Sequence, residues 1–237
     1  TGTPLPRIED AVRIGEQFRA AIMGRARHVL GGRDNIPPGL SGHGLDPDNR
    51  HAHAFYLPED ADGDGRIDHI LVHVPGGLSL NAQKVLNRLT LFRGRRGMEW
   101  RVILEELGQA EGFCNDSGYA GESRVWQSVT PYLRPWHLKK KPSIQEQNEA
   151  FVRKECLLRK LPEPECIEWL PQIGVHGKTR RPIHFHRFRN KPGLRQPDTQ
   201  GCFLRLHFAE PVKGPLALGF GCHFGLGMFA RICGDKQ

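Results

Sequence analysis

The fold is organised around the stretch Ser41–Pro75, which reads SGHGLDPDNRHAHAFYLPEDADGDGRIDHILVHVP. Two apolar runs, Ala52–Leu57 and Arg66–Val74, flank an acidic segment that contains two glycines. Such runs on either side of a glycine-aspartate turn are typical of a β-hairpin. The stretch also concentrates five of the twelve histidines of the chain: His43, His51, His53, His69 and His73.

The spacing of these histidines gives them a candidate chemical role. Alternation along the first run predicts that His51 and His53 project from the same face of the strand. The polar segment Asp34–Asn49 predicts an exposed loop that carries His43. Neighbouring imidazoles on one face can be metal ligands, catalytic groups or ordinary surface side chains, and the hairpin alone does not choose among these.

The turn of the hairpin matches part of a calcium-binding loop. Asp60, Asp62 and Asp64 stand at its positions one, three and five. Leu71 occupies the twelfth position, where such a loop requires a glutamate, and no helical pattern flanks the segment. We therefore expect a structural turn, with calcium binding as the alternative.

Composition limits the class of protein. A chain of 237 residues can form one large domain or two of about 100 residues. The net charge of +8 favours a polyanionic partner such as nucleic acid, although an ordinary basic protein has the same charge. No apolar run has transmembrane length and no signal-peptide pattern opens the chain, so we expect a cytoplasmic protein without a membrane partner. The chain does not begin with Met, so we expect a piece of a longer protein.

The cysteines argue against a zinc or redox site. None of the six belongs to a C-x-x-C pair, which structural zinc sites and thiol oxidoreductases commonly use. We expect buried free thiols.

Periodicity and turn signals predict an α+β protein. Apolar spacing and capping residues predict helices over Ile8–Leu30, Ser79–Leu91 and Ser143–Lys160. Besides the hairpin we expect four regular strands, over Met98–Leu107, Cys166–Val175, Ile183–Phe188 and Cys202–Phe208, and an irregular strand bordering a cleft in the proline-containing run Val125–Lys141. The order of elements in residues 1–121 fits a ferredoxin-like half, and residues 122–237 form a second, β-rich half.

Two segments of the second half suggest contact with RNA. In Val125–Lys141, aromatic residues alternate with proline and end in three lysines; Trp and Tyr can stack on unpaired bases, but they can equally be buried beside a solvated charge run. In Leu218–Arg231, four glycines surround His223, as in loops that offer backbone amides to anions.

Several motifs in this order resemble one known family. They are Ser41-Gly-His43, His51-Ala-His53, the turn Asp62–His69, the run Ser128–His137 and the segment Gly221–Gly227. Together they resemble the Cas-six-like, C-terminal part of type I-G (formerly I-U) CRISPR-associated proteins, in which a Cas-five-like and a Cas-six-like part are fused. In the wider repeat-cleaving family five residues separate the two glycine pairs of the loop, whereas three separate Gly221 from Gly225 here.

The resemblance covers most of the chain and implies both a fold and an activity. It implies two tandem ferredoxin-like (RRM-like) domains with a C-terminal glycine-rich loop, so that residues 122–237 would be an RRM-like RNA-binding domain. It implies an endoribonuclease that cleaves precursor CRISPR RNA within its repeats to give mature guide RNA. The implied partners are CRISPR repeat RNA and other subunits of a type I effector complex.

Metal-independent cleavage of RNA requires a base for the 2′-hydroxyl, an acid for the departing 5′-oxygen and positive charge near the phosphate. We expect His43 and His51 or His53 to be the base and the acid, with His137 in reserve and no metal or other cofactor. The expected RNA-binding residues are Lys139, Lys140, Lys141, Arg180, Arg181, Gly219, Gly221, His223, Gly225 and Gly227.

Two other classes of function remain open at this point. A non-catalytic subunit would hold processed CRISPR RNA in an effector complex without cleaving it. A metal-dependent hydrolase would use His51, His53 and either Asp68 or His69 as ligands, although no dense metal-binding signature is present.

Overall fold

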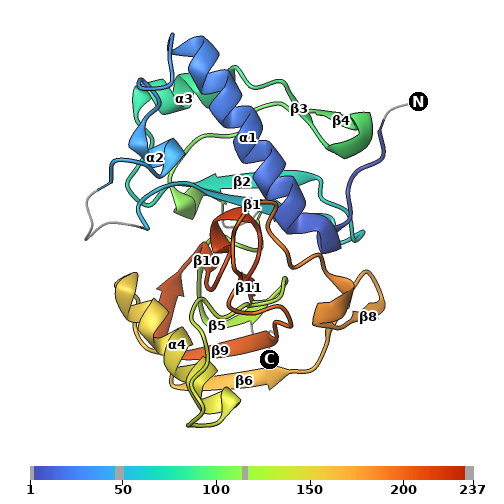
Figure 1. Cartoon of the computed structure of the whole chain (residues 1–237), viewed down its shortest axis with the longest axis vertical. Helices are drawn as coiled ribbons and strands as arrows, with labels where there is room; N and C mark the ends of the chain where they lie inside the picture. The colour runs from blue at the N-terminus through green and yellow to red at the C-terminus, as the bar shows by residue number, and fades with distance from the viewer. Residues whose placement is uncertain (1–2, 46–50, 114–116, 233–237) are drawn as a thin grey trace.

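The computed structural model describes residues 3–45, 51–113 and 117–232, which form an α+β structure with two halves stacked along the long axis of the molecule (Figure 1). Cys114 and Cys233 lie outside the described residues. Among the described residues, no helix is long and apolar enough to cross a lipid bilayer.

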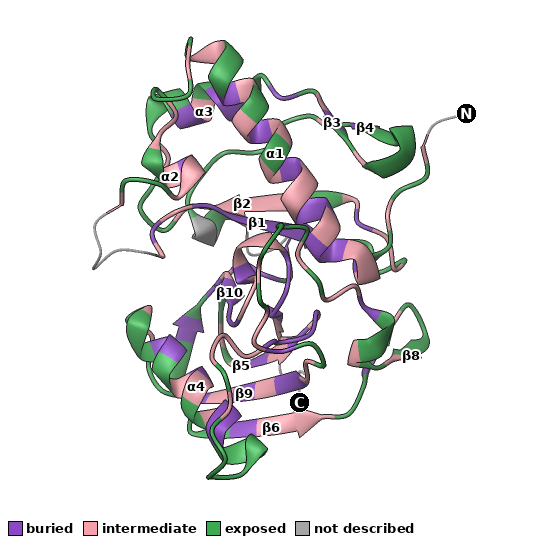
Figure 2. Cartoon of the chain, viewed as in Figure 1, coloured by how far each residue is buried: buried purple, intermediate pink, exposed green. Residues whose placement is uncertain are grey.

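The first half is a long helix packed on a β-hairpin. Helix α1 (Ala11–Val29) follows a 3₁₀ turn, η1 (Ile8–Asp10), and lies across the hairpin of β1 (Phe55–Glu59) and β2 (His69–His73) (Figure 1). Its buried residues follow helical spacing, so one face meets the hairpin and the other meets solvent (Figure 2). The remaining elements of this half are α2 (Pro38–Ser41), α3 (Leu80–Asn87), β3 (Leu91–Arg93), η3 (Arg95–Gly97), β4 (Glu99–Arg101) and η4 (Ala110–Phe113).

The second half is a five-stranded antiparallel sheet in the order β10-β11-β5-β9-β6. Helix α4 (Ile144–Leu158) begins with a complete capping box, in which Ser143 and Glu146 bond each other's backbone N–H groups. The strands of the sheet are β5 (Glu122–Ser128), β6 (Cys166–Leu170), β9 (Phe203–Lys213), β10 (Leu216–Ala217) and β11 (Met228–Arg231). Outside the sheet lie β7 (Ile173–Val175), β8 (Lys178–Arg180), η5 (Pro182–His184) and η6 (Cys222–Phe224).

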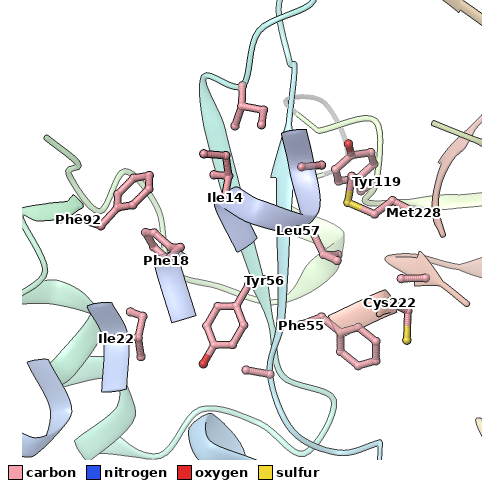
Figure 3. Packing of buried hydrophobic residues seen from close by; sticks show 14 of the residues in the cluster. Ile14, Phe18, Ile22, Phe55, Tyr56, Leu57, Phe92, Tyr119, Cys222 and Met228 are labelled. Carbon is pink, nitrogen blue, oxygen red and sulfur yellow. The ribbon is translucent and has the colours of Figure 1, made fainter. Parts of the chain in front are cut away.

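A hydrophobic core continues from one half into the other. Phe55 and Leu57 of β1 belong to the same buried cluster as Cys222 and Met228 of the C-terminal segment (Figure 3). A second cluster fills the space between α4 and the five-stranded sheet. The halves are therefore joined by shared packing, which places the C-terminal glycine-rich segment against the hairpin.

The helices and the hairpin are confirmed. Ser79 caps α3 by accepting a hydrogen bond from the Ala82 N–H, and the hairpin pairs Phe55 with His73 and Glu59 with His69. The mixed α+β class is also confirmed.

Other expected elements are wrong. His51 and His53 precede β1, because the backbone of Ala52 bonds Gly76 of a loop and that of Ala54 bonds Gly39 of α2, instead of a strand. Met98–Leu107 contributes only the three residues of β4, because β3 offers a partner of the same short length.

Two expectations in the second half also fail. Ile183–Phe188 is not a strand: Pro182 opens η5, and the His186 N–H then bonds the carbonyl of Glu9. Cys166–Val175 is divided into β6 and β7, which belong to different sheets.

Burial corrects the interpretation of the aromatic run and of the cysteines. Trp126 and Tyr132 are fully buried, so neither offers a stacking surface to RNA. Cys156 and Cys222 are buried free thiols as expected, whereas Cys166 is exposed.

Candidate active site

Three histidines from opposite ends of the chain meet between the two halves. The ring of His223 stacks on that of His53 with centroids 3.9 Å apart and planes 4° apart. It stacks equally closely on Phe55, at 3.8 Å and 22°, and the ring of His51 lies 5.8 Å away at 11°. Two rings so close to one imidazole must occupy its opposite faces, so His223 is held between His53 and Phe55.

Close backbone approaches hold this stack in place. Gly42 lies against the ring of His53, since a Cβ at residue 42 would come within 2.9 Å of the His53 Cδ2. On the other side, η6 presses directly on α1 at Gly15, where a Cβ would lie 2.8 Å from the carbonyl carbon of Phe224. The site therefore depends on glycines in segments far apart in the sequence.

The protonation state of His223 follows from its contacts. Its Nδ1 lies 3.1 Å from the carbonyl oxygen of Ala54, which can only accept, so Nδ1 carries the proton. Burial, together with neighbouring His53, lowers the pKa of His223 well below its usual value. The ring is neutral at pH 7, and its Nε2 keeps a lone pair.

His51 is neutral at pH 7 as well. Burial lowers its pKa to about 4, and the positive charge of Arg159 and the proximity of His53 act in the same direction. Its Nδ1 is buried and has no hydrogen-bond partner among the described residues. Neutral imidazoles in a half-buried position are suited to accept a proton.

Sequence reasoning missed two contributors to this site. The sequence pattern assigns Phe55 only to a strand and Arg159 only to the end of a helix. Arg159 is buried near the C-terminal end of α4 and pairs with Glu155 at 3.0 Å. A charged pair at i and i+4 on a helix gives no sign in the sequence that it is buried, so no pattern indicated it.

The other two expected catalytic histidines, His43 and His137, lie outside the stack. His43 is exposed and follows Gly42, the residue that contacts His53, so the loop does bring it to the edge of the stack. His137 is exposed, and no ring contact or hydrogen bond between described residues joins it to His51 or His223.

The expected basic residues are spread over the surface. Lys139, Lys140 and Lys141 are exposed, and Gln147 holds their loop by bonding both the N–H and the C=O of Lys139. Arg180 is engaged in an ion pair with Glu9, whereas the side chain of Arg181 is exposed.

The glycine-rich loop is packed more tightly than an open anion-binding loop. Gly219, Gly225 and Gly227 are buried, and all four glycines have positive φ angles. A Cβ at residue 225 would come within 2.9 Å of Pro58. These glycines position His223; their contact with RNA remains a prediction.

The ligand set of a metal-dependent hydrolase is not assembled. The hairpin register places His69 opposite Glu59, four residues along β1 from Phe55, which is about 13 Å at the rise of a strand. His69 instead bonds Asp68 and Glu105, both at 2.9 Å. Among the described residues, the alternative of a metal-dependent hydrolase with His51, His53 and either Asp68 or His69 as ligands is therefore not supported.

The acidic turn is the described group of side chains that best fits a cation. Oxygens of Asp60, Asp62 and Asp64 lie within 4.8 Å of one another. Each of these carboxylates also accepts a bond from a backbone N–H of the turn, from Gly65, Asp64 and Arg66 respectively. These bonds account for the acidic residues as turn formers.

Comparison with known proteins adds no family assignment. The chain matches no protein-family model, no curated protein and no solved structure. The functional argument therefore rests on the residues and their geometry.

Proposed function

We propose that this chain is a metal-independent endoribonuclease that cleaves precursor CRISPR RNA within its repeats. The observation that carries the proposal is the convergence of His51, His53 and His223 in one half-buried stack beside a buried arginine. Imidazoles and a fixed positive charge are what cleavage of an RNA phosphodiester requires without a metal.

The strand order of the second half supports the ferredoxin-like part of the proposal. Along the chain, β5, β6, β9 and β11 are the first to fourth strands, and their spatial order is four-one-three-two with α4 between the first two. This is the order of a split β-α-β sheet. The glycine-rich segment with η6 replaces the second helix of that arrangement.

The first half supports the same arrangement less completely. The extended residues before α1 lie beside the hairpin: the Ile67 N–H bonds the carbonyl of Pro6 at 2.7 Å, and the Trp100 Nε1 bonds that of Pro4 at 3.0 Å. This segment, α1, the hairpin, α3 and the β3-β4 pair come in that order along the chain, which fits β-α-β-β-α-β if the pair takes the place of the last strand. The described strands form two separate pairs, β1-β2 and β3-β4, so a continuous first sheet is a proposal only.

The chemistry proceeds without a cofactor. A neutral imidazole takes the proton of the 2′-hydroxyl, the 2′-oxygen attacks the phosphorus, and the bond from phosphorus to the 5′-oxygen breaks. A second group donates a proton to that 5′-oxygen, which leaves a 2′,3′-cyclic phosphate and a 5′-hydroxyl. His51 fits the base because it is neutral, and the negative charge of a bound phosphate raises its pKa towards the working range.

We assign the role of general acid to His43, at the edge of the stack. His43 is exposed and follows Gly42, the residue that contacts the ring of His53. The lysines Lys139, Lys140 and Lys141 would bind phosphates outside the cleavage position. His53 is the alternative to His43 or His51 in either role.

The test compares single variants on labelled repeat RNA in the presence of EDTA. We expect His51→Ala and His43→Ala to lower the cleavage rate at least about 100-fold, within the usual range for an acid or base. His223→Phe keeps an aromatic ring between His53 and Phe55 but removes both nitrogens, so a loss of rate in this variant would show that cleavage needs the imidazole of His223 as well as its place in the stack. His28→Ala, on the exposed end of α1, is the matched control.

The outcomes separate the proposal from its alternative. Wild-type rates in all three site variants would exclude the histidine mechanism, and loss of wild-type cleavage with EDTA would exclude metal independence. Tight binding of repeat RNA with no product in the wild type would favour a non-catalytic RNA-binding subunit.

A further inference from the structure

A buried ion pair at the C-terminal end of α4 contacts the segment that carries His223. The side chains of Glu155 and Arg159 are 4% and 10% exposed, and the Arg159 Nη2 is 3.0 Å from the Glu155 Oε1. Taking two charges out of water costs several kcal/mol per ion unless geometry and hydrogen bonds offset it. Such a pair therefore calls for a specific reason.

The two side chains of the pair contact the glycine-rich segment at Gly219 and at Cys222. The Glu155 Oε1 accepts a hydrogen bond of 3.0 Å from the N–H of Gly219. The Arg159 Nη2 lies 3.5 Å from the Sγ of Cys222, the residue before His223. The Arg159 side chain also bonds the backbone of α4, since its Nη1 donates to the carbonyl oxygen of Glu155 at 3.1 Å. The position of His223 is thus tied to α4 through both members of the pair.

Stability alone does not explain the arrangement. The Arg159 Nε is buried and makes no hydrogen bond with described residues, while the Tyr132 hydroxyl interacts with the carboxylate of Glu155. A buried polar atom without a partner is costly, and replacing such a pair by uncharged side chains of similar volume is often neutral or stabilising. A pair kept only for stability would not leave the Arg159 Nε without a partner.

The charge of Arg159 also reaches His51. The groups that bear on His51 come from three elements: Arg159 from α4, His53 from the same segment and His223 from η6. Arg159 is the one permanent cation among them. After burial, it is the strongest cause of the lowered pKa of His51.

We propose that Arg159 is a positioning residue for the RNA-cleaving histidines. Held by Glu155, it fixes the turn that carries His223 and keeps a permanent positive charge behind the rings, so that the imidazoles stay neutral until a phosphate binds. The inference rests on the proposed function for its effect on cleavage, but its effect on histidine protonation belongs to the free protein.

The test is a double variant of the full chain, Glu155→Gln with Arg159→Met. It removes both charges and keeps the volume, and the amide oxygen of residue 155 can still accept from Gly219. The readout is titration of each histidine by NMR between pH 8 and about pH 3, which includes the pKa of about 4 of wild-type His51, with ring signals assigned by single histidine substitutions. We expect His51 to bind its proton up to about tenfold more tightly than in the wild type, and the acid limb of the cleavage profile to move to higher pH accordingly.

The matched control is Arg153→Met with Glu163→Gln, which removes a partly exposed pair from the same region at 3.8 Å. It should leave the titration of His51 and the cleavage profile unchanged. A folded Glu155→Gln, Arg159→Met protein in which His51 titrates as in the wild type would overturn the proposal. If the wild type does not cleave RNA, the proposed function fails, while the NMR titration still decides the role of Arg159.

Arg159→Lys decides the question if the double variant does not fold. Lysine keeps the charge but cannot span Glu155 and Cys222 as a fork. We expect near-wild-type titration of His51 with kcat at least about tenfold lower and KM unchanged. Wild-type kcat in Arg159→Lys would overturn the positioning role.

Discussion

Gly15 on α1 offers a sharp test of how the two halves build the site. In an exposed helix position, replacing glycine by alanine stabilises by about 1 kcal/mol, because alanine loses less backbone entropy on folding. At Gly15 the added Cβ would lie 2.8 Å from the Phe224 carbonyl carbon and nearer still to its oxygen. Ordinary contact between such atoms is about 3.5–4 Å, so η6 must move by roughly 1 Å.

The gain in helix stability from alanine and the cost of the clash with Phe224 oppose each other, and the clash is the larger of the two. Overpacking of this kind costs about 1–3 kcal/mol, so Gly15→Ala should be up to about 2 kcal/mol less stable than the wild type. Because η6 carries His223, a shift of about 1 Å at the site should lower cleavage by about 100-fold. Gly24 lies on the same helix with nothing within 4 Å of a Cβ, so Gly24→Ala is the matched control.

The assay pairs urea unfolding with single-turnover cleavage of repeat RNA. We expect Gly24→Ala to gain about 1 kcal/mol and to cleave like the wild type, and Gly15→Ala to lose both stability and rate. Equal stabilisation by both substitutions, with cleavage unchanged, would show that η6 does not pack on α1 as described.

Three further predictions follow from individual residues. Burial lowers the pKa of His73 from 6.5 to about 4, so its contribution to stability is complete above pH 6.5 and is lost as pH falls towards 4. Urea unfolding should show about 2 kcal/mol less stability at pH 5 than at pH 7.5 from this group, and His73→Phe should reduce that difference. Ser117 donates its hydroxyl to the buried carboxylate of Glu59 at 2.7 Å, so Ser117→Ala should cost about 1–3 kcal/mol in thermal unfolding, whereas Ser79→Ala, which removes only the cap of α3, should cost about 1 kcal/mol. Alanine at Lys139, Lys140 and Lys141 should weaken RNA binding and lower the slope of log binding constant against log salt concentration by about 0.7 for each phosphate that is no longer neutralised. Lys84→Ala should change neither quantity. An unchanged slope in the triple variant would exclude these lysines from the RNA interface.

Local features of this protein could be predicted from the sequence. Apolar spacing and the caps at Ser79 and Ser143 act within one or two turns, so α1, α3 and α4 follow from their own residues. The hairpin follows from its turn, whose carboxylates bond the backbone of the turn itself. The His51-Ala-His53 motif is likewise visible in the sequence because its two histidines are close neighbours in the chain, although β1 begins only at Phe55.

The assembly of the site depends on contacts that no local pattern contains. His223 meets residue 53 because η6 packs on α1 at Gly15, and a glycine inside a helix has several possible causes. Alternation in Ile183–Phe188 fits a strand, but the hydrogen bond from the His186 N–H to the Glu9 carbonyl places that segment beside η1 instead. Trp126 is an aromatic residue in a basic, proline-rich run, and its place in the core is decided by the sheet around it.

The central claim is that the converging histidines cleave RNA without a metal. The most direct measurement is to incubate the wild-type chain, with EDTA present, with a labelled CRISPR-repeat RNA from the genome that encodes it, and to identify the ends of any product. The account predicts a single cut that leaves a 2′,3′-cyclic phosphate and a 5′-hydroxyl, and no cut when the nucleotide before it lacks its 2′-hydroxyl. A cut that needs a divalent metal, or one that persists on the 2′-deoxy substrate, would contradict it.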